Sequence, residues 1–254
     1  METLSTELLR NEVNKMGRAK DIIVKVIPKD IAEAFVKRNH YSGKVVAYSI
    51  LHFGVFLDGN LHGVMQFGGS LSKSKMLGLV ENTGWNEYLE LNRMAFDDYL
   101  PKNSESRAIS IAIRLIKEKA PHIKWIVSFA DGSQCGDGTI YRASGFLLTQ
   151  IIKNTTMWKM PDGEVLSHMS FAPTIGTPHL LNKYGKVGQY SNWSSKRFLE
   201  HIKAVPIEGF QLRYIYLIDK NCKLNVPILS FEEIDKKGAG MYKSEKITIK
   251  ERRE

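Results

Sequence analysis

Hydrophobic residues near the start of the chain follow first the period of a strand and then that of a helix. Residues 21–27, DIIVKVI, form an apolar run that predicts a strand. Proline at residue 28 suits the start of a helix, and Ile31, Ala34 and Phe35 follow at helical spacing. We therefore predict a helix that packs one face on a sheet and ends near residues 39–43, NHYSG.

The next pattern predicts a β-hairpin. Two alternating runs within residues 52–68 flank Asp58-Gly59-Asn60, a strong short-range hairpin signal. Residues 70–86 are rich in Gly, Ser and Lys and break the alternation. We predict two antiparallel strands followed by a loop.

Residues 89–146 predict one continuous strand, helix and strand unit. It consists of the strand LELNRMAF, the helix SESRAISIAIRLIKEK, the strand IKWIVSFAD and the phrase YRASGF. Ile109, Ile113 and Ile116 give the helix an apolar stripe, so it packs on the sheet. This order puts the helix N-terminus beside the strand ends where ligands usually bind, and it predicts that the strands 89–96 and 123–129 splay apart around a ligand cleft. The site is expected near Arg93, Ser106, Asp131 and Tyr141.

The C-terminal part continues with strands at residues 147–154 and 210–219 and with a hairpin around Pro161-Asp162-Gly163. Between them, residues 178–202 interleave aromatic residues with cations, a pattern that suits stacking on bases and pairing with phosphates. A basic loop with a few core aromatics remains an equal alternative. The predicted DNA-binding cations are Lys183, Lys186, Lys196 and Arg197.

The expected organisation is one α/β domain with extensions. Residues 1–20 form a polar extension, 21–152 the catalytic core, 153–235 the C-terminal part of the same domain, and 236–254 a loosely ordered basic tail. The sheet is expected to be central and mixed, with helices on its faces.

The composition indicates what kind of partner the protein binds and in which compartment it works. With 36 Lys and Arg against 27 Asp and Glu, the net charge is +9, which favours an anionic partner such as nucleic acid. The two cysteines, Cys135 and Cys222, imply neither a disulfide framework nor a zinc knuckle. The N-terminus has no signal-like apolar segment, and no apolar run has membrane length. We therefore expect a cytoplasmic protein that neither enters nor crosses a membrane.

The order of elements, with YRASGF ahead of its last strand, resembles the GNAT acyltransferase fold over about residues 21–152. Most members of that family carry a Gly-rich loop that holds the coenzyme A pyrophosphate at the start of the central helix. Here the corresponding segment, PKNSESRAIS, has no glycine. The resemblance implies a GNAT-like core and, as an alternative function, an acyltransferase that uses acyl-CoA on a small molecule or protein.

Four segments also resemble the Mom family of phage DNA-modifying proteins: RNHYSG, LELNRM, SESRAIS and SFADGSQCGDGTIYRASGF. The resemblance implies a transferase that converts adenine in double-stranded DNA to its carbamoylmethyl derivative and protects phage DNA from restriction in the cytoplasm of a bacterial host. It also implies a functional constellation formed by His40, Tyr41, Arg93, Ser106, Asp131 and Tyr141. Within this constellation the resemblance suggests an iron site at His40, Tyr41, Asp131 and Tyr141.

The residue types leave alternatives open at each position. His40 and Tyr41 suit metal ligation or acid/base work, or a helix cap; Asp131 suits a cleft carboxylate or a turn cap. Tyr141 suits proton donation to a leaving group, as in acyltransferases of this fold, or a place in the core.

Three basic or polar residues are expected to bind an anionic donor or substrate. Strand alternation puts Arg93 on the face of Leu91 and Ala95, where it binds an anion or pairs with an acid such as Glu90 or Asp131. Ser106 and Arg107 offer a hydroxyl and a guanidinium to a phosphate, while serine at 104 is expected to cap the helix.

The group donor also stays open. A carbamoylmethyl group has the carbons, oxygen and nitrogen of a glycyl unit, and relatives of this fold accept aminoacyl-tRNA. Glycyl-tRNA is therefore one candidate donor, and acyl-CoA with a metal is the other.

Overall fold

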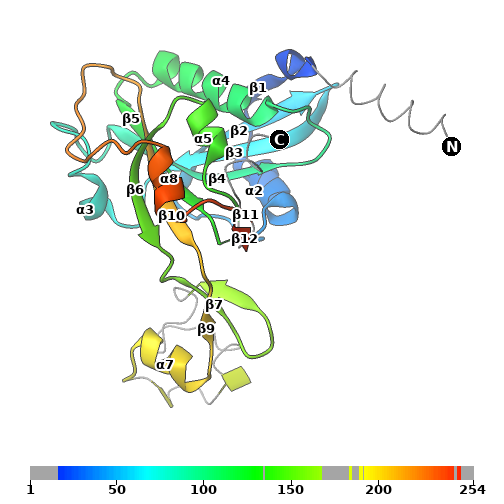
Figure 1. Ribbon diagram of the computed structural model, residues 1–254. Helices are drawn as coiled ribbons and strands as arrows, with labels where there is room; N and C mark the ends of the chain where they lie inside the picture. The colour runs from blue at the N-terminus through cyan, green and yellow to red at the C-terminus, as the bar shows by residue number, and fades with distance from the viewer. Residues whose placement is uncertain are drawn as a thin grey trace. The chain divides into compact units, whose positions relative to one another are not determined.

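The computed structural model describes residues 17–133, 135–167, 183–184, 189–190, 192–242 and 245–246 (Figure 1). Their backbone forms two compact units. The first takes its described residues from Met1–Phe129, Gly138–Gln150 and Arg213–Ser230, and the second from Ala130–Asp137, Ile151–Leu212 and Phe231–Glu254. No helix in this described part of the chain is long and apolar enough to cross a bilayer.

A seven-stranded mixed sheet, ordered β1-β2-β3-β4-β5-β10-β6, forms the centre of the first unit, which confirms the expected α/β fold class. β1 to β4 pair antiparallel in succession, and β4 pairs with β5 in parallel. Figure 1 shows α2 and α4 on opposite sides of β2 to β4. The elements are η1 (Arg18–Asp21), β1 (Ile23–Val26), α2 (Lys29–Asn39), β2 (Ser49–Leu57), β3 (Asn60–Gly68), α3 (Lys73–Met76), β4 (Tyr88–Phe96), α4 (Ser104–Lys119), β5 (Trp125–Asp131), α5 (Thr139–Ala143), β6 (Leu147–Lys153) and β10 (Phe210–Leu217).

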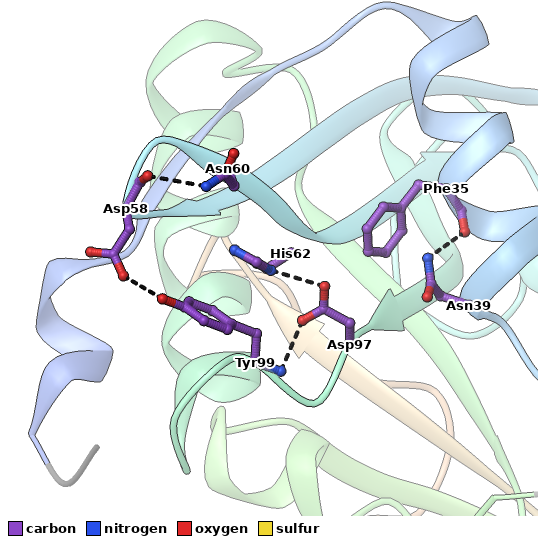
Figure 2. Close-up of polar contacts among 7 residues, drawn as sticks. All are labelled: Phe35, Asn39, Asp58, Asn60, His62, Asp97 and Tyr99. Atoms are coloured by element: carbon purple, nitrogen blue, oxygen red, sulfur yellow. Dashed lines mark hydrogen bonds and ion pairs between the residues drawn. The ribbon is translucent and has the colours of Figure 1, made fainter. Parts of the chain in front are cut away.

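The predicted hairpin between β2 and β3 is confirmed. Asp58 and Gly59 both have positive φ, 52° and 81°, as a two-residue turn between twisted strands requires. Figure 2 shows how this turn is tied to the segment after β4: the Tyr99 hydroxyl donates to Asp58 Oδ2 at 2.8 Å. His62 Nδ1 lies 2.9 Å from Asp97 Oδ2, and the Tyr99 amide donates to Asp97 Oδ1. This network fixes the far end of the β2–β4 sheet.

β4 and β5 diverge after a short parallel ladder, which confirms the predicted splay, while the ligand cleft between them stays a prediction. Their last ladder pair joins Glu90 to Val127, whereas β4 continues to Phe96 and β5 to Asp131. Beyond Glu90, β4 therefore pairs with β3 along one edge while its other edge leaves the β5 ladder.

A β-bulge in β4 sets the orientation of its polar residues. Along β3, Gln66 pairs with Arg93 and Gly68 pairs with Glu90, so three residues of β4 span the distance that two span in β3. Paired residues share a face, and Gln66 and Gly68 share one because they are two apart. Glu90 and Arg93 therefore lie on the same face of the sheet, although an odd number of positions separates them.

The bulge corrects the expected orientation of Arg93. Leu91 pairs with Phe67, which lies on the opposite face of β3 from Gln66, so Leu91 and Arg93 point to opposite sides. Arg93 does share its face with Ala95, as expected. Simple alternation failed because the bulge inserts one residue between Leu91 and Arg93.

The second unit contains a small three-stranded sheet, ordered β8-β7-β9, and further short elements. These are β7 (Met157–Lys159), β8 (Val165–Ser167), α7 (Ser195–His201), β9 (Val205–Pro206), α8 (Glu232–Lys236), β11 (Met241–Tyr242) and β12 (Glu245–Lys246). Its core consists of Met160, Leu166, Tyr190, Phe198, Leu199 and Ala204. The hairpin at Pro161-Asp162-Gly163 is confirmed by the pairing of β7 with β8.

Two expectations for this unit need correction. The segment interpreted as a basic aromatic loop contains α7, because Ser194 caps the helix by accepting from the Arg197 amide at 3.2 Å. The tail expected to be loosely ordered contains β11 and β12, which pair antiparallel.

Candidate functional site

Polar residues of β4 gather where that strand leaves the β5 ladder. Arg93 donates from Nε to the Lys44 carbonyl at 3.0 Å and from Nη1 to the Asn92 carbonyl at 2.8 Å. Two backbone carbonyls thus hold the half-buried guanidinium, and its charge opposes the raised pKa of Glu90. Arg93 and Glu90 share one face of the sheet, while the expected binding of an anion by Arg93 stays a prediction.

His40 follows the last residue of α2, where Asn39 Nδ2 donates to the Phe35 carbonyl at 3.0 Å (Figure 2). Its Nδ1 accepts from the Ser42 amide at 3.1 Å and lies 2.8 Å from Ser42 Oγ. Burial, and secondarily the charge of Arg93, lower the pKa of His40 from 6.5 to about 4. The imidazole is therefore neutral near pH 7, with its proton on Nε2.

Tyr41 lies against this imidazole. The two ring centroids are 4.2 Å apart, and the Tyr41 side chain remains 55% exposed. The structure therefore brings together two of the four residues expected at the iron site, His40 and Tyr41, and the charge of Arg93 acts on His40.

Glu90 and Tyr48 add a carboxyl and a phenol to this cluster. Burial raises the pKa of Glu90, while Ser70, Asn92 and Arg93 oppose the shift. Burial also raises the pKa of Tyr48, and the charge of Glu90 raises it further. A carboxyl group with a raised pKa suits proton transfer at neutral pH.

A hydrogen-bond network supports these groups from β2. The Ser49 hydroxyl donates to Asn92 Oδ1 at 3.0 Å, and Asn92 Nδ2 donates to the Gly69 carbonyl at 3.1 Å. At Gly68 a side chain would overlap the Tyr48 carbonyl, so glycine permits the close approach of β2 and β3. The Tyr48 carbonyl therefore lies directly against β3 at Gly68.

Sequence reasoning missed Tyr48 and treated Glu90 as an uncommitted acid or a partner for Arg93. The missing signal is the bulge, which aligns Glu90 with Arg93. Tyr48 precedes β2 in a segment without regular periodicity.

Tyr141 lies in α5 and is only 9% exposed. Its ring centroid lies 5.5 Å from that of Phe146 and 5.4 Å from that of Tyr214. This is the core environment considered as its structural alternative, and its catalytic role stays a prediction.

Asp131 is the last residue of β5 and belongs to the second unit. Its Oδ1 accepts from the Ser133 amide at 3.0 Å and from the Ser133 hydroxyl at 2.5 Å. The carboxylate therefore caps the turn that follows the strand.

At the start of α4, Ser106 Oγ donates to the Asn103 carbonyl at 3.2 Å, and Arg107 Nη2 donates to the Lys20 carbonyl at 3.2 Å. The expectation that Ser104 caps this helix is wrong. Ser104 is the first helical residue, and its hydroxyl donates to the Pro101 carbonyl, while Asn103 occupies the cap position without a side-chain hydrogen bond.

The predicted DNA-binding cations have different surroundings. Lys183 forms an ion pair with Asp162, and Lys196 lies 3.8 Å from Glu200. The Arg197 guanidinium lies 4.2 Å from the centre of the Trp193 ring. Lys186 lies outside the described residues.

Residues 21–233 match the model of the Mom protein family. The chain belongs to this family. One curated relative, the methylcarbamoylase mom of Escherichia phage Mu, is 33% identical over 206 residues, which cover 81% of this chain and 79% of the relative.

Solved acetyltransferase structures are more distant. The ribosomal-protein-S18-alanine N-acetyltransferase from Escherichia coli is 10% identical with a TM-score of 0.41, and the match covers 78% of this chain and 94% of that one. The IAA acetyltransferase from Bacillus cereus gives 10% identity and a TM-score of 0.40, covering 77% and 99%. Similarity at this level carries no argument about activity.

The iron site implied by the Mom resemblance fits one part of the constellation. His40 offers a neutral imidazole, the form that binds metals, beside the phenol of Tyr41. In the described part of the chain, no group of three or more His, Cys, Asp or Glu side chains is arranged to hold a metal. The four residues expected to hold iron include only two of these types, His40 and Asp131, and iron remains a prediction.

Proposed function

We propose that this chain converts adenine in DNA to its carbamoylmethyl derivative and thereby protects phage DNA from restriction. The observation that carries the proposal is the 33% identity, over 81% of the chain, to a relative named as a methylcarbamoylase. The net charge of +9 agrees with a DNA substrate.

The chemistry requires a base near the reacting amine. The exocyclic amine of adenine is a weak nucleophile, and in the duplex it must first be extruded from the stack. We assign the proton-accepting role to Glu90, because burial raises the pKa of this carboxyl toward the working range. The guanidinium of Arg93, held by the Lys44 and Asn92 carbonyls, would then stabilise the negative charge that develops on the acyl oxygen.

A glycyl donor accounts for the product without an oxidant. The amine of adenine attacks the glycyl ester carbonyl, forms a carbon–nitrogen bond, gives its proton to the base, and releases the ribose hydroxyl of the tRNA. The free glycine amine then attacks C6 of adenine and breaks the original C6–nitrogen bond, so that this nitrogen becomes the terminal amide. The second step is an isomerisation. Acyl-CoA with a metal remains the competing route.

Double-stranded DNA is the proposed partner. In the second unit, the Arg197 guanidinium lies over the Trp193 ring. The charge of Lys183, in contrast, is neutralised by an ion pair with Asp162. We therefore expect Arg197 to contribute more to DNA binding than Lys183.

The test is mass spectrometry of nucleosides from plasmid DNA in cells that express the chain. The wild type and Glu87→Gln should yield carbamoylmethyl-adenine, because the Glu87 carboxylate is engaged in an ion pair with Lys124. Glu90→Gln should yield far less. Unmodified DNA from wild-type cells, together with acetyl-CoA binding that needs no DNA, would instead support an acyltransferase acting on another substrate.

A further inference from the structure

The second unit contains a cavity of about 380 Å³, within the range of roughly 300–1,000 Å³ typical of small-ligand sites. Its lining comes from the end of β6, the segment between β9 and β10, and the segment after α8. The residues that matter here are Lys153, Glu208, Phe210, Lys237 and Met241.

The cavity has a built wall on the β6 side. The Asn154 amide donates to the Gly209 carbonyl at 2.8 Å, and its Nδ2 donates to the Ile207 carbonyl at 2.9 Å. Asn154 Oδ1 in turn accepts from the backbone amides of Thr156 and Met157. The hydrogen bonds of this side chain join β6 to the segment before β10 and hold this wall of the cavity in place.

The opposite wall backs onto the turn that follows Asp131. The Gly132 amide donates to the Phe210 carbonyl at 2.8 Å, and a Cβ at Gly132 would lie 3.2 Å from Met241 Cβ. The cavity therefore lies next to the turn whose carboxylate belongs to the predicted constellation.

Two lysines at the cavity suit an anionic ligand. Lys153 and Lys237 are both exposed in the lining, and the charge of Lys237 also acts on Glu233. Glu208 also lies in the lining. A phosphodiester carries one negative charge, with which exposed lysines can pair.

We propose that this cavity receives one unpaired nucleotide of the DNA strand, with its phosphate at Lys153 and Lys237 and its base against the half-buried Phe210. Aromatic and apolar side chains take up a base by stacking, and cations follow the backbone. The inference rests on the proposed function, because a flipped or single-stranded base is what such an enzyme must hold.

The test uses the full-length chain and a single-stranded oligonucleotide that carries 2-aminopurine, so that no duplex must open. Lys153→Gln with Lys237→Gln should weaken binding about 10-fold and reduce the slope of log K against log salt by about 0.7 for each phosphate that the variant no longer neutralises. Lys117→Gln with Lys119→Gln, two exposed lysines in the last turn of α4, is the charge-matched control and should have a smaller effect. Equal binding by both double variants would overturn the proposal.

Phe210→Leu tests the base contact. It should reduce the quenching of 2-aminopurine and weaken binding by roughly 5-fold or more, while the salt slope stays the same. Full quenching in this variant, or displacement of the oligonucleotide by coenzyme A from wild type but not from the Lys153/Lys237 variant, would assign the cavity to another ligand.

The outcome is separable from that of the proposed function. If plasmid DNA carries the modified adenine but both cavity variants bind and modify like wild type, the cavity proposal fails alone. If the variants lose oligonucleotide binding but no modified adenine forms in wild-type cells, the cavity proposal stands and the proposed function fails.

Discussion

Protonation of His40 should destabilise the fold as the pH falls. The pKa of His40 is about 4 in the folded chain against an ordinary value of 6.5. Below pH 6.5 His40 binds a proton in the unfolded chain but stays neutral in the folded chain. Its contribution to the free energy of unfolding therefore falls between about pH 6.5 and pH 4 and is constant below that range.

The size of the effect follows from the two pKa values. Between pH 7 and pH 5 the full linkage amounts to roughly 2 kcal/mol. Because the imidazole is partly exposed, solvent screening should reduce the loss to about 1 kcal/mol. Glu90 contributes with the opposite sign, since its pKa is raised and protonation favours the folded state.

The assay compares urea denaturation at pH 7 and pH 5, at constant ionic strength, for wild type and His40→Asn. Asparagine retains an acceptor for the Ser42 amide but does not titrate, so the variant should lose about 1 kcal/mol less than wild type over this interval. His122→Asn, at an exposed histidine, should behave like wild type. An NMR titration of His40 should give a midpoint near 4. Equal pH losses for wild type and His40→Asn would refute the reasoning.

Three further results are expected. Glu90→Gln should lower the rate of DNA modification by about 10²-fold or more and remove the acid limb of the pH–rate profile; an unchanged limb would exclude Glu90 as the base. Gly138→Ala should cost about 1–3 kcal/mol more in thermal or urea unfolding than Gly163→Ala, since both glycines have positive φ but only at Gly138 would a Cβ overlap Tyr214; equal costs would contradict the close approach. Arg197→Gln should reduce the salt slope of duplex binding by about 0.9, and an unaltered slope would show that Arg197 contacts no phosphate.

The parts of the fold that the sequence predicted are those encoded locally. Asp58-Gly59 specifies its turn through two positive φ angles, and the apolar stripe of the central helix specifies its buried face. The divergence of β4 from β5 followed from the order of elements.

The parts that sequence reasoning missed depend on pairing between distant segments. The bulge in β4 appears only when that strand is aligned with β3, so the side of the sheet that Arg93 occupies was predicted only in part. The aromatic residues of segment 178–202 were expected either to stack on bases or to lie in the core, and Tyr190 lies in the core of the second unit. Its burial depends on Phe198 and Leu199, whose helix is short and was obscured by the surrounding cations.

Because of the extra residue in β4, the number of residues in this strand decides whether Glu90 and Arg93 share a face of the sheet. β2 has an irregularity against the same stretch of β3, between Ser49 and Leu51, so insertions occur on both sides of one strand. Substitution of Asn92 by any residue type would leave the bulge intact, because the number of residues between Glu90 and Arg93 stays the same. Deletion of that one position would rotate either Glu90 or Arg93 to the other side and separate the acid from the cation. In this family, aligned gaps within β4 should therefore mark changes of chemistry more reliably than the identity of the surrounding residues.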